Sequence, residues 1–333
     1  MKKQNLAIII LSLLLMFTMT ACGQAAQNNS TAGNEQKPAS DTGKLAVYTS
    51  IYPLYFVASK IGGEHASVKN IVPAGTEPHD FEPTAKDIVD MSKAQVFIYN
   101  GSGFESWIEK AMEGFDQSKM VIVNATEGMQ LLEASNEEHG HDEHGGENTG
   151  EEAKTDHEHG ELNPHVWLDP SLLKVQAEKV RDAFIKADQA HSEVFNQNYE
   201  KLAADLDALD QEFKDMVAKT KQKEFMVSHS AFSYLAHKYG LEQVPISGLS
   251  PADEPSPAEM KELVEHVKEH NIKYVMFETL VSPKVAEVIA REAGVKTAVL
   301  NPLEGLTVDE EKAGKNYLTI MRENLETLRT ALQ

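Results

Sequence analysis

Short apolar runs alternate with amphipathic helical segments along most of this chain. In the first half, the pattern predicts strands at 45–50, 66–72, 96–100 and 120–124, and helices at 53–61, 84–91 and 104–112. In the second half, it predicts strands at 224–228, 241–246, 274–277 and 296–300, and helices at 231–239, 257–270, 283–293 and 310–332. This alternation predicts an α/β protein with two lobes of about four βα units, each built on a largely parallel sheet.

Two helical segments, 171–186 and 191–219, separate the halves. The second carries an apolar stripe made of Val194, Tyr199, Leu202, Leu206, Leu209 and Phe213. Because it is long and has little loop chemistry, we expect a rigid helical connector between the lobes. The predicted limits are 44–170 for the N-terminal lobe, 171–222 for the helical segment and 223–333 for the C-terminal lobe.

The first 21 residues have the pattern of a secretory signal peptide. Lys2 and Lys3 precede an apolar run, 6–17, which is short for a spanning helix, and small residues follow it. Residues 22–43 are rich in small polar residues and predict a flexible tether. Cys22 is the only cysteine, and it is either an incidental residue of the signal peptide or a lipidation site. The segment Met19-Thr20-Ala21-Cys22 resembles the lipobox of bacterial lipoproteins, and this resemblance implies that Cys22 is lipidated and anchors the protein to the membrane.

The composition is that of a soluble globular protein with a strong negative charge. The formal net charge is −21, and it becomes −23 once the two lysines of the signal peptide are removed. A chain of this charge repels nucleic acid and anionic membrane surfaces but tolerates cationic ligands.

Four candidate metal ligands lie next to predicted helices or strands, in comparable places of the two halves. His79 lies in the loop after the second strand, and His165 lies between Pro164 and Pro170 before the connector. His229 and Glu278 directly follow two strands of the second half. Ligands of open α/β sheets bind outside the carboxyl ends of strands, so we expect these side chains to meet between the lobes. Three imidazoles and one carboxylate suit Zn²⁺.

The chain offers further candidate residues. A loop at about 134–161 carries five histidines, which are either solvated low-complexity residues or weak auxiliary metal ligands: His139, His141, His144, His157 and His159. Glu77 is a possible substitute or additional carboxylate ligand. His266 and His270, four apart on a helix, are interpreted as an exposed solvated pair rather than a chelating one. Four aromatic residues are interpreted as packing residues: Trp107, Trp167, Phe232 and Tyr234.

Four segments together carry a family resemblance. They are Pro78-His79-Asp80-Phe81-Glu82-Pro83, Asn163-Pro164-His165-Val166-Trp167-Leu168-Asp169-Pro170, Ser228-His229-Ser230-Ala231-Phe232 and Phe277-Glu278-Thr279. In this order they resemble the metal-ligand segments of cluster A-I solute-binding proteins, the zinc and manganese receptors of bacterial ABC permeases. The histidine-rich loop is similar to that of the zinc-uptake receptors.

The resemblance implies two α/β lobes joined by a long rigid helix, with the metal between them. It implies a monomeric extracytoplasmic lipoprotein, not an enzyme, which delivers Zn²⁺ to the membrane permease and ATPase of an ABC importer and binds no nucleic acid. A manganese receptor is the nearest alternative, although imidazole favours zinc. A zinc hydrolase would use Glu278 as a base, but no His-Glu-x-x-His element is present. A surface adhesin would leave the metal ligands unexplained.

Overall fold

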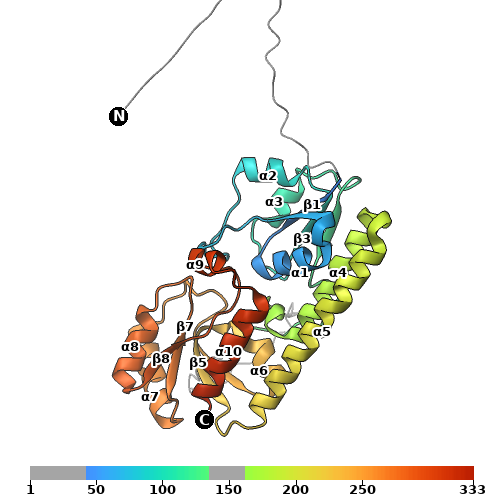
Figure 1. Ribbon diagram of the computed structural model, residues 1–333. Helices are drawn as coiled ribbons and strands as arrows, with labels where there is room; N and C mark the ends of the chain where they lie inside the picture. The colour runs from blue at the N-terminus through green and yellow to red at the C-terminus, as the bar shows by residue number, and fades with distance from the viewer. Residues whose placement is uncertain (1–42, 135–161) are drawn as a thin grey trace, which may run out of the picture. The chain divides into compact units, whose positions relative to one another are not determined.

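The computed structural model describes residues 43–134 and 162–333, and these residues belong to one compact unit (Figure 1). The predicted signal peptide, Cys22 and most of the tether lie outside the described residues. The five loop histidines from His139 to His159 also lie outside them.

Each lobe is built on a four-stranded parallel sheet. In the N-terminal lobe the strand order is β2-β1-β3-β4, with β1 Leu45–Thr49, β2 Ala66–Asn70, β3 Val96–Tyr99 and β4 Val121–Asn124. In the C-terminal lobe the order is β6-β5-β7-β8, with β5 Glu224–His229, β6 Glu242–Ser247, β7 Tyr274–Phe277 and β8 Lys296–Val299. The two orders are equivalent, and the predicted α/β class with two parallel sheets is confirmed.

Helices follow the strands in both lobes. The N-terminal lobe contains α1 Tyr52–Gly62, α2 Ala85–Met91 and α3 Ile108–Met112. The C-terminal lobe contains α6 Ser233–Tyr239, α7 Pro257–Glu269, α8 Lys284–Ala293, α9 Val308–Lys312 and α10 Tyr317–Ala331. Local sequence signals explain where several of these helices begin. Pro53 occupies the first turn of α1, and Ser256 and Glu259 form a capping box at the start of α7.

The connector consists of α4 Pro170–Ala187 and α5 Ser192–Val217. Figure 1 shows α5 running alongside both lobes. Near its start, Asn198 Nδ2 donates a hydrogen bond of 3.0 Å to the carbonyl oxygen of Ile61 in α1. Near its end, Phe213 stacks on Tyr239 of α6 with ring centroids 5.2 Å apart. Because one uninterrupted helix packs against both lobes, it forms the long connecting helix that the pattern predicts.

Two helices differ from the prediction. The helix expected at 104–112 covers only the second half of that range, because Ser102 and the glycines on both sides of it have positive φ and form a loop. Glu105 holds this loop by accepting hydrogen bonds from the backbone N–H groups of Asn100 and Gly101, at 2.7 and 2.9 Å. The helix expected at 310–332 is divided into α9 and α10, because Gly314 is left-handed and Asn316 caps a new helix.

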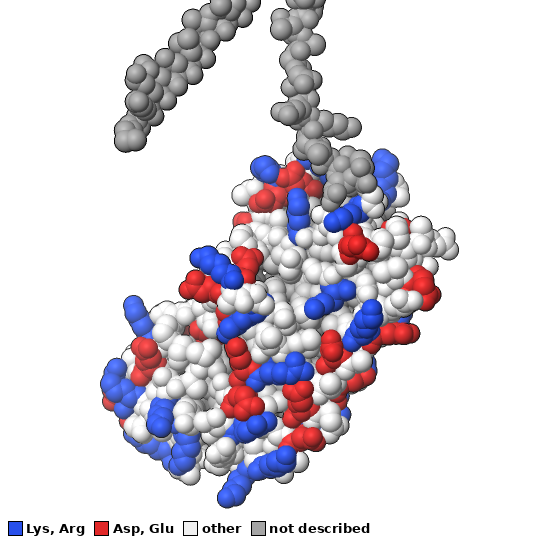
Figure 2. All heavy atoms as spheres, viewed as in Figure 1, with Lys and Arg blue, Asp and Glu red and all other residues white. Residues whose placement is uncertain are grey.

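The largest core cluster joins elements of both lobes with α4, α5 and α10. On the face shown in Figure 2, basic and acidic side chains are interspersed over both lobes, without a patch of one sign. Within the described ranges, no helix has the length and apolar character needed to cross a bilayer.

Candidate metal centre

His79 lies on the loop between β2 and α2. His79 lies in a turn that is closed by a hydrogen bond of 3.2 Å from the N–H of Phe81 to the carbonyl oxygen of Pro78. The imidazole packs against Phe104, with ring centroids 4.5 Å apart, and its side chain keeps 12% of its surface exposed. His79 is therefore held in the N-terminal lobe at the least enclosed position of the centre.

His165 is fully buried just before α4. Asn163 holds it twice, because its Oδ1 accepts a hydrogen bond of 3.0 Å from the backbone N–H of His165 and lies 2.9 Å from His165 Nδ1. Asn163 Nδ2 in turn donates to the carbonyl oxygen of Ser230 at 2.8 Å. Trp167 packs beside the imidazole with ring centroids 5.2 Å apart, in agreement with its predicted packing role. The ring of His165 is thus oriented by contacts that reach into the C-terminal lobe.

His229 is the last residue of β5 and is also fully buried. Its Nδ1 lies 2.6 Å from Oε1 of Glu278, the residue that follows β7. β5 and β7 are neighbours in the sheet, so the two side chains meet where their strands end. A carboxylate at Nδ1 fixes the tautomer in which this nitrogen carries the proton and leaves the Nε2 lone pair for a metal.

Glu304 reaches the centre from the loop after β8, and this loop is fixed on several sides. Trp167 Nε1 donates to the carbonyl oxygen of Pro302 at 2.8 Å. Asn301 exchanges two hydrogen bonds with Asn324 of α10, at 2.8 and 2.7 Å. Leu303 has a φ of +59°, a conformation that non-glycine residues rarely adopt and that surrounding contacts must hold. These contacts place the carboxylate of Glu304 with only 2% of its side chain exposed.

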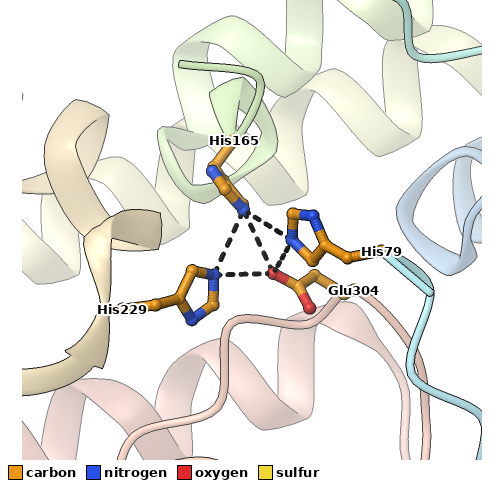
Figure 3. A group of neighbouring side chains, drawn as sticks. All are labelled: His79, His165, His229 and Glu304. Atoms are coloured by element: carbon orange, nitrogen blue, oxygen red, sulfur yellow. Dashed lines mark hydrogen bonds and ion pairs between the residues drawn. The ribbon is translucent and has the colours of Figure 1, made fainter. Parts of the chain in front are cut away.

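Figure 3 shows the side chains of His79, His165, His229 and Glu304 converging on one point from separate elements. The Nε2 of His165 lies 3.3 Å from the Nε2 atoms of both other histidines. Oε1 of Glu304 lies 3.3 Å from Nε2 of His79 and 3.1 Å from Nε2 of both His165 and His229. In a tetrahedral zinc site with metal–ligand distances of about 2.0–2.1 Å, the ligand atoms are about 3.3 Å apart. The group therefore has the dimensions of a closed four-ligand metal site.

Burial and charge act in opposite directions at this centre. Burial lowers the pKa of His165 to about 3, so this imidazole is neutral at physiological pH. Burial also acts to lower the pKa of His229, but the carboxylates of Glu278 and Glu304 outweigh it and raise the pKa to about 10. Burial acts to raise the pKa of Glu304, while His79 and His229 hold it well below its usual value. The metal-free centre therefore holds a proton on His229, which a metal ion must displace.

The structure groups the predicted ligands differently at one position. The structure groups the three predicted histidines with Glu304, whereas Glu278 contacts His229 on the nitrogen that faces away from the centre. Glu278 directly follows β7, the strand beside β5, so its carboxylate reaches Nδ1 of His229 and not the point where the four ligand atoms meet. Glu304 also follows a strand, so the rule that ligands bind at carboxyl ends applied to both residues, but it could not choose between them.

Glu77 is a neighbour of the centre but not a member of the group. Its Oε2 accepts a hydrogen bond of 3.0 Å from the backbone N–H of Asp80, while its buried Oε1 has no hydrogen-bond partner. Burial, followed by the charge of Glu304, raises its pKa. Trp107, Phe232 and Tyr234 are buried, in agreement with their predicted packing roles.

Comparisons with known proteins identify the family of this chain. The family described as "ZnuA: Zinc-uptake complex component A periplasmic" matches residues 47–331. The chain is 39% identical over 320 residues to the "High-affinity zinc uptake system protein ZnuA" of Bacillus subtilis (strain 168), covering 95% of this chain and 97% of that protein. It is 40% identical over 287 residues to the "Zinc-binding lipoprotein AdcA" of Streptococcus pneumoniae, covering 86% of this chain. The chain spans only 56% of the length of that second relative.

A solved structure gives the same result at the level of the fold. The structure of the Zn(II)-bound ZnuA-like domain of Streptococcus pneumoniae AdcA superposes with a TM-score of 0.72 at 38% sequence identity. The match covers 87% of this chain and 99% of that domain.

Proposed function

The chain belongs to the family of the periplasmic component A of zinc-uptake complexes, and from this membership we propose that its four-residue centre binds Zn²⁺ as cargo between the two lobes. The protein is an extracytoplasmic zinc receptor of an uptake system and not an enzyme, as its relatives are zinc-binding transport receptors.

The observation that carries the proposal is the spacing of the four ligand atoms. Five of the six distances between them lie between 3.1 and 3.3 Å, close to the edge of a zinc tetrahedron. Three imidazole nitrogens and one carboxylate oxygen form a donor set that suits zinc, whereas Mn²⁺ is better served by oxygen ligands. We therefore propose His79, His165, His229 and Glu304 as the ligands of zinc.

The donor set also supports transport over catalysis. A catalytic zinc keeps an open position for water and usually has three protein ligands. Here four protein atoms surround one point, and the side chains of His165, His229 and Glu304 are at most 2% exposed. Glu278, which a hydrolase would need as a base, contacts His229 Nδ1 instead. A site of this kind encloses its metal ion and gives a substrate no access to it.

In addition to zinc binding, we propose that the zinc-loaded protein acts as a monomer and delivers zinc to the membrane permease and ATPase of an ABC importer. The sequence Met19-Thr20-Ala21-Cys22 supports anchoring through a lipidated Cys22 to the outer face of the cell membrane. We also propose that the histidines of the loop from His139 to His159 capture additional zinc weakly. The Gly, Glu and Asp content of this stretch predicts little order without metal, so each bound ion would have to offset ordering entropy.

Native mass spectrometry with competing Zn²⁺ and Mn²⁺ tests the proposal. We expect one tightly held Zn²⁺ per chain, which equimolar Mn²⁺ does not displace. His229→Ala should abolish this tight site. His237→Ala is the matched control, because His237 is an exposed histidine on α6 in the same lobe. Preferential retention of Mn²⁺, or a tight zinc site that survives His229→Ala, would contradict the proposal.

A further inference from the structure

A second group of possible metal ligands lies on the surface of the C-terminal lobe. It consists of Glu224, the first residue of β5, with His266 and His270 from the C-terminal end of α7. Each residue offers one ligand atom, and these atoms lie within 4.8 Å of one another. Within residues 43–134 and 162–333, this is one of two such groups, and the other is the centre between the lobes.

The helix and the strand together arrange this group. Residues four apart on a helix lie on the same face, one turn above the other. The rings of His266 and His270 are accordingly stacked, with centroids 4.0 Å apart and an interplanar angle of 13°. Glu224 uses one carboxylate oxygen for each ring: Oε2 lies 2.6 Å from His270 Nδ1, and Oε1 contacts His266 Nε2. One carboxylate thus bridges two parallel imidazoles, and this contact differs from the solvated pair that the sequence predicts.

The surrounding structure keeps these side chains in place. Leu263 and Val267 anchor α7 in the apolar core of the lobe, with 7% and 1% exposure. Gln222 Nε2 donates a hydrogen bond of 3.2 Å to the carbonyl oxygen of His270 where the helix ends. The side chain of Glu224 is only 11% exposed, so its carboxylate is held below the two more exposed rings. The backbone on both sides of the group is therefore fixed before any ligand binds.

We propose that Glu224, His266 and His270 form an auxiliary site for a divalent cation that favours imidazole, such as Zn²⁺ or Cu²⁺. The site has three protein ligands and faces solvent, so water completes the coordination and the metal exchanges readily. It therefore binds more weakly than the enclosed four-ligand centre and fills only after that centre is saturated.

The position of the auxiliary site makes it independent of the central one. Glu224 begins the strand that ends with His229, so the two sites lie at opposite ends of β5, roughly 16 Å apart along the strand. The auxiliary site shares no residue with the centre. A metal bound there would link the end of α7 to the start of β5 and stabilise the C-terminal lobe.

Zinc stoichiometry of the full-length protein tests the proposal. Equilibrium dialysis should show that the double variant His266→Gln/His270→Gln loses one weakly bound zinc ion and keeps the tight one. The matched control is His65→Gln/His191→Gln, because these rings are also stacked, with centroids 4.0 Å apart, and Asp188 lies 2.6 Å from His191. This second pair is not part of a three-ligand group in the described chain, so the control should keep the wild-type stoichiometry. Histidines elsewhere are common to all three proteins and cancel in the comparison.

A spectroscopic measurement keeps the test independent of stoichiometry. With the central site filled by zinc, stepwise addition of Cu²⁺ should broaden the imidazole NMR signals of His266 and His270 at lower Cu²⁺ concentrations than those of His65 and His191, whatever share the loop histidines take up. Glu224→Gln should reduce this broadening while circular dichroism shows an unchanged fold. Equal zinc binding by wild type and the His266→Gln/His270→Gln variant, or equal broadening of both ring pairs, would overturn the proposal.

Discussion

Replacing Glu304 and Glu278 separately by glutamine distinguishes a metal ligand from a residue that orients one. The substitution keeps the size of each side chain and removes only its charge. In Glu304→Gln, the zinc ion loses its one anionic ligand in a buried site. Removing one partner of a buried charge pair costs about 3–5 kcal/mol, so zinc affinity should fall by roughly 10²- to 10⁴-fold.

Glu278→Gln should have a much smaller effect. In the wild type, His229 Nδ1 lies 2.6 Å from Glu278 Oε1. The amide oxygen of the glutamine can still accept this hydrogen bond, so the variant loses only the contribution of the negative charge to its strength. A charged hydrogen bond contributes about 1.5–3 kcal/mol and a neutral one about 0.5–1.5 kcal/mol. The difference of about 1–1.5 kcal/mol corresponds to roughly a fivefold to tenfold loss of zinc affinity.

Competition titrations against a chromophoric zinc chelator measure both variants on one scale. Glu77→Gln is the matched control, because this carboxylate lies close to His79 and Glu304 but outside the ligand group, and zinc affinity should change little. The reasoning is refuted if Glu278→Gln weakens zinc binding as much as Glu304→Gln does. It is equally refuted if Glu77→Gln has the largest effect, since Glu77 would then be the fourth ligand.

Three further results are expected. Since the pKa of His229 is raised to about 10, zinc must displace its proton at any lower pH, and zinc affinity should fall at least about tenfold per unit from pH 9 to pH 7. Burial acts to lower the pKa of His79, but Glu304 outweighs it and raises this pKa, so His79 steepens the slope towards neutral pH. Histidines near 6.5 would give a flat profile over this range, and chelator competition across pH measures the slope. His165, with a pKa of about 3, adds nothing to it. Deleting residues 137–160 should lower total zinc stoichiometry but leave the tight site; its loss in a folded variant would show that the loop supplies a primary ligand. Cys22→Ser should release the protein from the membrane fraction or leave the signal uncut, and unchanged processing and retention would exclude the anchor.

The sequence alone determined most of the fold and three of the four proposed ligands. Alternating strands and helices are local patterns, so two parallel sheets and a long connecting helix were readable from the chain. His79, His165 and His229 were found because proline-framed loops and strand ends restrict where their backbone lies. The same local reasoning failed for the helix at 310–332, because the left-handed Gly314 and the Asn316 cap end one helix and start another.

The tertiary structure decided which carboxylate joins the histidines. Both Glu278 and Glu304 follow strands, and nothing in their local sequence ranks them. The strand order places Glu278 directly beside His229, on the Nδ1 side, where it orients the ring. The loop of Glu304 reaches the common point because Trp167, from the other half of the chain, and Asn324 of α10 hold its backbone in place. The bridge from Glu224 to His266 and His270 has the same origin, because a strand start and a helix end become neighbours only when the lobe folds.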